Sequence, residues 1–248
     1  MAATILGVQV DLTSNVDAIG QVLGWAKYGE SHYVCIANVH MVMEAYDSVD
    51  YRNIINSADL VTPDGMPLVW MMRAKGYRNQ ERVYGPTIML QVLEVAAHEN
   101  VRVGFYGTTP DLLDSLTKRM RMRYEGLSIA YSYSPAFGVM SAEEDAAVVK
   151  QINQSGARIL FVGLGCPKQE IWMAAHRGKV NAVMVGVGAA FDFHAGVKPQ
   201  APAWMQKVGL EWLFRLFIEP RRLWRRYLYH NPRFIVLAVA DLLGLLKD

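Results

Sequence analysis

The chain has 248 residues, of which 52% are hydrophobic and 19% charged, with a formal net charge of +2. This composition is typical of a globular protein with a sizeable core, built as one large domain or as a domain with an appendage. No run approaches the roughly 18 apolar residues of a membrane span, and no signal peptide is evident at the start, so we expect neither. The two cysteines, Cys35 and Cys166, favour a reducing compartment over a disulfide scaffold, and we expect a cytoplasmic location.

Short apolar runs alternate with helical patterns over most of the chain. Strands are predicted over residues 33–37, 60–62, 101–106, 127–131, 158–162 and 182–187. Helices are predicted between them, among them 67–75, 88–98 and 110–124. Strands that alternate with helices favour parallel pairing and right-handed crossovers. We therefore predict a Rossmann-like α/β domain over residues 1–198, with a mostly parallel sheet and helices on both faces.

The positive charge is concentrated in the remaining segment, residues 199–248. Its eight basic and four acidic residues give it a net charge of +4, which leaves −2 for the rest of the chain. The pattern is helical over 203–230, interrupted by Pro220, and an apolar helix broken by Asp241 follows over 234–246. Helices with arginine on one side and Trp, Phe and Leu on the other suit a membrane surface, so we predict a helical, membrane-docking appendage. An ordinary helical hairpin packed on the domain is the alternative.

One strand-end turn carries a lone carboxylate, Asp64. Pro63 fixes its own φ, Gly65 permits backbone angles that other residues resist, and Pro67 belongs to a first helical turn. The carboxyl end of a strand is where open α/β sheets bind ligands, so Asp64 is a candidate catalytic residue. The alternative is that Asp64 only caps the following helix, a role that Asp fills well.

Other motifs exclude several classes of protein. The turn Gly163-x-Gly165 fails as a dinucleotide fingerprint because Lys168 stands in place of the third glycine. It still sets backbone N–H groups beside a helix start, which suits a polar or anionic ligand. We find no P-loop, no Asp-x-Asp pair, no Gly-x-Ser-x-Gly elbow and no His/Cys cluster with metal-ligand spacing. Ser141 and Glu144 read as a helix capping box.

Polar side chains recur at successive strand ends and in one adjoining loop: Asn38, Asp64, Arg82, Gln169, Glu170 and Asp192. Because the carboxyl ends of parallel strands meet at one edge of a sheet, we expect these residues to share a crevice. A single carboxylate base with arginines and no metal suits displacement of a phosphate leaving group. The base takes the proton of the acceptor hydroxyl, and guanidinium groups hold the departing diphosphate bidentately.

Five stretches carry a resemblance to a known family: 58–65 (ADLVTPDG), 82–85 (RVYG), 163–170 (GLGCPKQE), 186–193 (GVGAAFDF) and 211–222 (EWLFRLFIEPRR). On these motifs the chain resembles, over nearly its whole length, the WecG/TagA/CpsF family of bacterial glycosyltransferases, glycosyltransferase family 26. The resemblance implies inverting, metal-independent transfer of an N-acetylmannosamine-type or glucose-type sugar from a UDP-sugar to a polyprenyl-diphosphate-linked saccharide. It also implies a place on the inner face of the cytoplasmic membrane, in synthesis of surface polysaccharide or wall polymer.

The resemblance also assigns roles to residues. Asp64 matches the proposed general base, and Asn38, Arg82 and Gln169 match pocket residues. Members of the family often have Thr two residues before the strand-end Asn, whereas this chain has Ile36, which leaves a hydroxyl contact there in doubt.

The resemblance further implies contacts from a loop and from the C-terminal segment. Phe137 matches an aromatic loop residue that stacks on uracil, and Arg215, Arg222 and Arg225 match arginines of an appendage that closes over the diphosphate. The full set of expected substrate-binding residues is Asn38, Thr62, Arg82, Gly85, Phe137, Gly163, Gly165, Gln169, Glu170, Asp192, Arg215, Arg222 and Arg225.

We expect no cofactor and no metal. The expected partners are the UDP-sugar, the lipid-linked acceptor and an anionic membrane surface, and homo-oligomerisation is left open. No nucleic acid is expected, because the basic aromatic segment follows a complete α/β domain and precedes an apolar helix. Two alternatives remain: a non-catalytic nucleotide-binding or membrane-scaffolding protein, and a nicotinamide-dependent dehydrogenase, which the failed glycine fingerprint disfavours.

Overall fold

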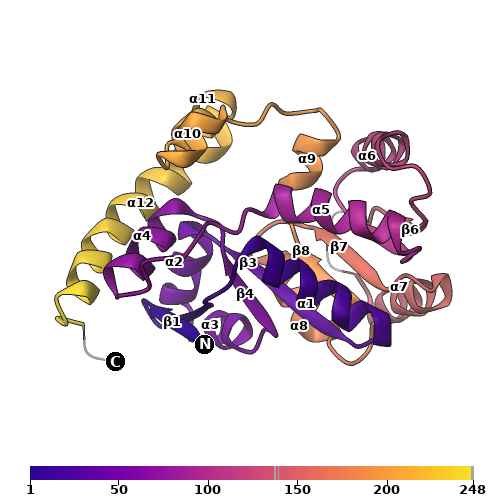
Figure 1. Ribbon diagram of the computed structural model, residues 1–248, viewed down its shortest axis with the longest axis horizontal. Coiled ribbons are helices and arrows are strands. Elements are labelled where there is room, and N and C mark those ends of the chain that lie inside the picture. The colour runs from indigo at the N-terminus through magenta and orange to yellow at the C-terminus, as the bar shows by residue number, and fades with distance from the viewer. Residues whose placement is uncertain (137, 139, 247–248) are drawn as a thin grey trace. The chain divides into compact units, whose positions relative to one another are not determined.

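The computed structural model describes residues 1–136, 138 and 140–246, and it is an α/β protein (Figure 1). Over this part of the chain, six strands form a sheet in the order β4-β3-β8-β7-β5-β6, and β1 (Ala2–Ile5) pairs with β2 (Val8–Asp11) in a separate antiparallel hairpin. The pairs β3–β8, β8–β7, β7–β5 and β5–β6 are parallel. The predicted α/β class with a mostly parallel sheet is therefore confirmed.

The strands of the larger sheet are β3 (His32–Ala37), β4 (Leu60–Pro63), β5 (Val103–Gly107), β6 (Ile129–Tyr133), β7 (Ile159–Gly163) and β8 (Val183–Gly186). Each begins and ends within two residues of the run predicted for it. The N-terminal hairpin was not predicted. Its inward-facing side chains Ile5, Val8 and Val10 are fully buried, which is the alternation expected of a strand with one covered face.

The chain forms two compact units. The first comprises residues 1–15, 36–84 and 200–248, and the second comprises residues 16–35 and 85–199. Each unit is therefore built from segments that are far apart in the sequence. The functional division predicted at residue 198 stays a prediction.

The second unit contains most of the parallel sheet and the helices α1 (Asn15–Tyr28, from Val16 onward), α5 (Gly85–His98), α6 (Pro110–Arg123), α7 (Ala142–Ser155), α8 (Lys168–His176) and α9 (Ala190–His194). Its core includes three buried rings: the ring of Phe105 lies 5.8 Å from that of Phe161 and 5.7 Å from that of Phe191, centroid to centroid. The capping box predicted at the start of α7 is confirmed, with both reciprocal hydrogen bonds between Ser141 and Glu144 present.

The first unit contains the hairpin, β4 and the helices α2 (Val39–Asp47), α3 (Val49–Asn56), α4 (Met66–Ala74), α10 (Ala203–Lys207), α11 (Glu211–Ile218) and α12 (Pro220–Leu242). The hairpin is tied to its neighbours by polar contacts. The backbone N–H of Val61 in β4 donates to the Asp11 carboxylate at 2.9 Å, and the Asn56 side chain bonds the backbone of Gly7 and Gln9. These contacts hold the strand that leads into the Asp64 turn.

The C-terminal helix departs from the sequence prediction. Pro220 interrupts the helical pattern as expected, because α11 ends at Ile218 and Pro220 opens α12. The separate helix predicted over 234–246 is wrong: α12 runs through Pro232 and Asp241 without a break. It lies beside α2 and α4 (Figure 1) and ends before the predicted limit, at Leu242.

Ion pairs along one face explain why α12 continues. The Arg233 guanidinium contacts Asp47 of α2 at 2.6 Å, and Asp241 contacts Lys75, the residue after α4, at 2.9 Å. These pairs follow Pro232, so the second half of the helix is fixed to the unit although the proline removes one backbone hydrogen bond. Within the described residues, no helix has both the length and the apolar character needed to cross a membrane.

Candidate functional site

A pocket of about 610 Å³ lies within the first unit. Its wall combines the residues after β3 and β4 with α4, the α10–α11 region and α12. Most of the lining is apolar, and it includes Trp70, Trp212 and Phe234. A largely apolar wall with a few converging polar groups is typical of a ligand site. Among those polar groups are Asn38, Asp64, Arg82, Glu211 and Arg215.

Asp64 lies in the turn between β4 and α4. Its backbone N–H donates to the carbonyl oxygen of Ala37 at 2.8 Å, which fixes the turn beside the end of β3. The alternative that Asp64 caps α4 is wrong, because the N-cap is Gly65 and the helix has no side-chain cap hydrogen bond. The Asp64 carboxylate instead accepts two hydrogen bonds at Oδ1 from Arg82, from Nε at 3.1 Å and from Nη2 at 2.8 Å.

Arg82 joins this turn to the C-terminal helices. Its Nη2 also donates to Oε2 of Glu211, in the first turn of α11, at 2.8 Å. The Tyr84 hydroxyl donates to the other oxygen of Glu211 at 3.2 Å, and the Arg82 guanidinium lies 4.0 Å from the centre of the Tyr84 ring. One cation thus lies between two carboxylates whose side chains are only 16% and 14% exposed.

Burial and charge shift the pKa values of this cluster. Burial raises the pKa of Asp64 above its ordinary value and the neighbouring Glu211 carboxylate acts in the same direction, against the opposing effect of Arg82 and Arg215. Burial and then Glu211 raise the pKa of Tyr84, so its hydroxyl keeps its proton. A carboxylate with a raised pKa that lines a pocket is suited to accept a proton near neutral pH.

Asn38 and Thr62 differ in their access to the pocket. Asn38 lines it and also caps α2, since its Oδ1 accepts from the Met41 backbone N–H at 3.2 Å. Thr62 is completely buried in β4 and is not part of the pocket wall.

The three predicted arginines of the C-terminal segment do not lie together. Arg215 lines the pocket, whereas Arg222 and Arg225 are exposed and do not. Arg222 pairs with Glu219 at 3.1 Å, and the Arg225 guanidinium lies 5.2 Å from the centre of the Trp224 ring. Arg226, which was not predicted, lines the pocket. Residues four and eight positions apart lie on the same face of a helix, so Arg226 shares a face with residues 230 and 234, which also line the pocket. This helical spacing is visible in the sequence.

The second unit holds another group of predicted residues, in and after the loop between β7 and α8. The backbone N–H of Gly165 donates to Gln169 Oε1 at 3.2 Å, and Gln169 Nε2 donates to Glu170 Oε1 at 2.7 Å. Both side chains are buried. At Gly163 a Cβ atom would lie 2.4 Å from the Phe191 ring, so only glycine fits there.

The remaining predicted residues are spread over the second unit. Asp192 in α9 pairs with Lys198 at 3.1 Å, and Gly85 opens α5. Phe137 lies outside the described residues. The expectation that the polar strand ends of both units share one crevice stays a prediction.

The sequence did not point to three residues of the pocket wall, Glu211, Arg226 and His230, or to Tyr84, which is hydrogen-bonded to Glu211. Tyr84 and Glu211 lie within the family motifs 82–85 and 211–222. The contact between Glu211 and Arg82 could not be predicted, because Glu211 is 129 residues after Arg82 in the chain and no local pattern connects them. His230 forms a possible metal-ligand group with His40 and Glu44, in which ligand atoms lie within 4.8 Å of one another. This group was missed because His230 lies on α12, far along the chain from His40 and Glu44 on α2.

The α/β fold thus places a largely buried acid after β4, next to Arg82 and to the pocket-lining Arg215 of α11. A model of the glycosyl transferase WecG/TagA/CpsF family matches residues 3–248. The chain belongs to this family.

Three bacterial relatives carry the same name, N-acetylglucosaminyldiphosphoundecaprenol N-acetyl-beta-D-mannosaminyltransferase. The protein of Bacillus subtilis (strain 168) is 29% identical over 244 residues, which cover 94% of this chain and 93% of the relative. That of Bacillus spizizenii is 31% identical over 208 residues, 84% of this chain and 78% of the relative. The protein of Staphylococcus aureus (strain NCTC 8325) is 28% identical over 224 residues, which cover 89% of this chain and 86% of the relative.

Replacing Arg82 by Met should destabilise the first unit strongly. The Asp64 and Glu211 carboxylates would stay buried without their shared cation, and breaking a buried pair in this way costs about 3–5 kcal/mol of the free energy of unfolding. The matched variant Arg222→Met removes only a surface pair with Glu219 and should cost less than about 1 kcal/mol. Urea unfolding of both variants measures the difference; equal losses would contradict the role given to Arg82.

Proposed function

We propose that this protein transfers an N-acetylmannosamine-type or glucose-type sugar from a UDP-sugar to a saccharide linked to a polyprenyl diphosphate. The observation that carries the proposal is Asp64, an acid with a raised pKa in the wall of a pocket, held there by Arg82. The name of the relatives supports it, since that name describes transfer of N-acetylmannosamine to N-acetylglucosaminyl-diphosphoundecaprenol.

Asp64 acts as the general base in the proposed reaction. The two hydrogen bonds that Arg82 donates to the Asp64 carboxylate both go to Oδ1, so among the described residues Oδ2 is the oxygen left to take the proton of the acceptor hydroxyl. The deprotonated oxygen forms a bond to the anomeric carbon as the bond to the UDP oxygen breaks. A single displacement of this kind inverts the anomeric configuration.

Guanidinium groups replace a metal in the proposed reaction. Arg215 and Arg226 line the pocket that contains Asp64, and planar guanidinium groups bind phosphate oxygens in pairs. They neutralise the charge that develops on the departing diphosphate, so we propose that the transfer step needs no metal ion.

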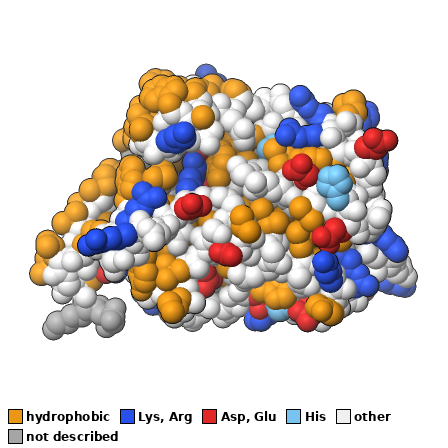
Figure 2. Space-filling view, viewed as in Figure 1, with side chains coloured by type: hydrophobic (Ala, Val, Ile, Leu, Met, Phe, Trp, Pro, Cys, Tyr) orange, Lys and Arg blue, Asp and Glu red, His pale blue; other side chains and the backbone are white. Residues whose placement is uncertain are grey.

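We also propose that the C-terminal helices dock on an anionic membrane surface, where a polyprenyl-linked acceptor resides. Large apolar side chains are exposed on this segment, among them Phe217, Leu228 and Val236. Figure 2 shows hydrophobic side chains gathered over these helices and interrupted by Lys and Arg side chains. Apolar contact together with cationic attraction is how interfacial helices bind membranes.

Replacing Asp64 by Asn should abolish transfer while donor binding persists. Loss of a general base lowers kcat by about 10²–10⁴-fold. The measurement is mass spectrometry of the lipid product with a panel of UDP-sugars, next to calorimetric titration with UDP. The matched variant Asp59→Asn, in the same motif but outside the pocket wall, should keep activity. Normal transfer by Asp64→Asn would show that Asp64 is not the base. Donor binding without any transfer by the parent chain would favour the alternative of a non-catalytic nucleotide-binding or membrane-scaffolding protein.

The pH profile should report the raised pKa of Asp64. The base must be ionised, so kcat/KM should fall as the pH drops through that pKa, above the ordinary value of 3.8. In Glu211→Gln a neighbouring negative charge is removed, and the acidic limb of the profile should move to lower pH. A limb that stays in place or moves to higher pH in this variant would contradict the coupling between the two carboxylates.

Introducing a charge on the exposed apolar surface should weaken membrane binding. Phe217→Glu and Leu228→Glu replace side chains that are 76% and 66% exposed, so the fold should tolerate both. We expect at least about a tenfold loss of binding to vesicles rich in phosphatidylglycerol, measured by sedimentation. Met122→Glu, equally exposed at 79% but in α6, is the control that should bind as the parent does. Unchanged partitioning of all three would contradict docking through this segment.

A further inference from the structure

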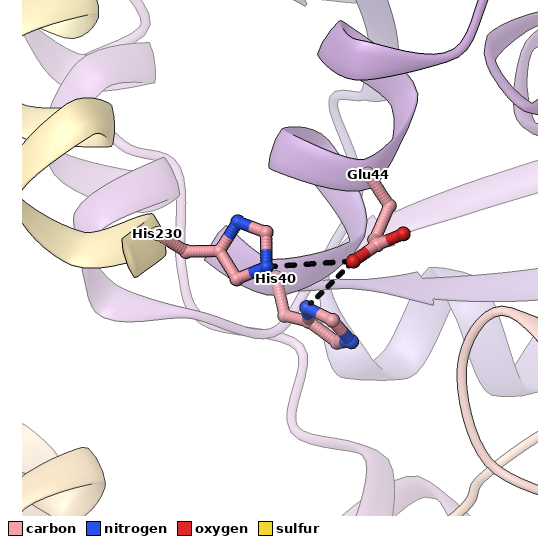
Figure 3. A group of neighbouring side chains, drawn as sticks. All are labelled: His40, Glu44 and His230. Atoms are coloured by element: carbon pink, nitrogen blue, oxygen red, sulfur yellow. Dashed lines mark ion pairs between the residues drawn. The ribbon is translucent and has the colours of Figure 1, made fainter. Parts of the chain in front are cut away.

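Two histidines and a glutamate meet between α2 and α12, within the first unit (Figure 3). His40 and Glu44 lie one turn apart on α2, so their side chains share a face of the helix. His230 reaches them from α12. In Figure 3 the two imidazole rings and the carboxylate point toward one another, with dashed lines from both rings to the same oxygen of Glu44.

The separations suit a shared ion better than direct hydrogen bonds. Oε1 of Glu44 lies 3.6 Å from Nδ1 of His40 and 3.4 Å from Nε2 of His230. Hydrogen bonds between nitrogen and oxygen are about 2.7–3.2 Å long. Ligand atoms at about 2.0–2.1 Å from a tetrahedral ion are separated by about 3.4 Å, which is close to both distances. All three candidate ligand atoms lie within 4.8 Å of one another.

The two histidines are shielded from solvent and lie in the pocket wall, which suits metal ligands. The His40 and His230 side chains are only 15% and 9% exposed, and both line the pocket. Imidazole nitrogens are the commonest protein ligands of transition-metal ions.

We propose that His40, Glu44 and His230 bind a divalent transition-metal cation of the zinc class, which clips α12 to α2. Two imidazole nitrogens and one carboxylate oxygen are ligands that Zn²⁺ accepts, whereas Mg²⁺ and Ca²⁺ prefer sites made of oxygen. Three protein ligands leave a fourth position for water.

The ion would act on the architecture of the pocket rather than on the sugar transfer. Residues of α2 and α12 form part of the pocket wall, and one turn beyond His230 the Arg233–Asp47 pair joins the same two helices. A cation that binds only the folded chain stabilises it by mass action. The inference does not depend on the proposed transferase activity, because it concerns binding and stability.

The test is a titration of the full chain with Zn²⁺ after treatment with EDTA, read by competition with a chromogenic chelator. We expect one Zn²⁺ per chain and a rise in Tm with added Zn²⁺. His40→Gln, Glu44→Gln and His230→Gln should each weaken binding by at least about tenfold and remove the shift in Tm. His98→Gln, which changes an exposed histidine of α5, is the matched control and should behave as the parent does.

Two results would overturn the proposal. One is a parent chain that binds Zn²⁺ no more tightly than the Glu44→Gln variant; the other is a loss of binding in His98→Gln alone. Circular dichroism of each metal-free variant establishes that it is folded, and Mg²⁺ in place of Zn²⁺ should leave Tm unchanged. Since none of these readouts measures sugar transfer, failure here and failure of the proposed function are distinguishable.

Discussion

The placement of one arginine between two largely buried carboxylates is the interaction on which the pocket depends. Arg82 bonds Asp64 at the end of β4 and Glu211 at the start of α11, and Tyr84 completes the link to Glu211. Without the cation, two desolvated carboxylates would repel each other, so the fold needs it. Burial raises the pKa of Asp64, the Arg82 charge lowers it and the Glu211 carboxylate raises it again, so the pKa stays above its ordinary value. Arg82 therefore joins the end of β4 to α11 and lowers the pKa of Asp64, whereas burial and the Glu211 carboxylate act in the opposite direction.

Local patterns predicted the strands and the Asp64 turn because both depend on neighbouring residues. Continuous apolar runs such as 159–162 can be buried only as strands or core helices, and their length and flanking glycines decide between the two. The turn is specified by Pro63, Gly65 and Pro67, all within four residues of one another. The N-terminal hairpin was missed since its strands have only four residues each, too few for alternation to stand out.

The partners within the site could not be predicted, because they are set by packing between distant segments. Glu211 contacts Arg82, which is 129 residues earlier in the chain, and the residues around either one do not indicate this contact. The continuity of α12 is a similar case. Pro232 predicts an interruption by local rules, yet contacts on both sides of it, from His230 to Glu44 and from Arg233 to Asp47, fix the helix against α2. Tertiary contacts here outweigh the local cost of the proline.

One face of α12 is packed against its own unit, and the other exposes apolar side chains. Its inner face is occupied: Phe234 and Ala238 are buried, and Asp241 pairs with Lys75. Its outer face still exposes Leu228 and Val236, among other apolar side chains. A helix that has already buried one apolar face gains nothing within its own unit from a second, so such a patch marks an interaction surface. In the proposed function that surface is the membrane. The same helix forms part of the pocket wall around Asp64, so under the proposed function a lipid-linked acceptor held at the surface would lie close to the base.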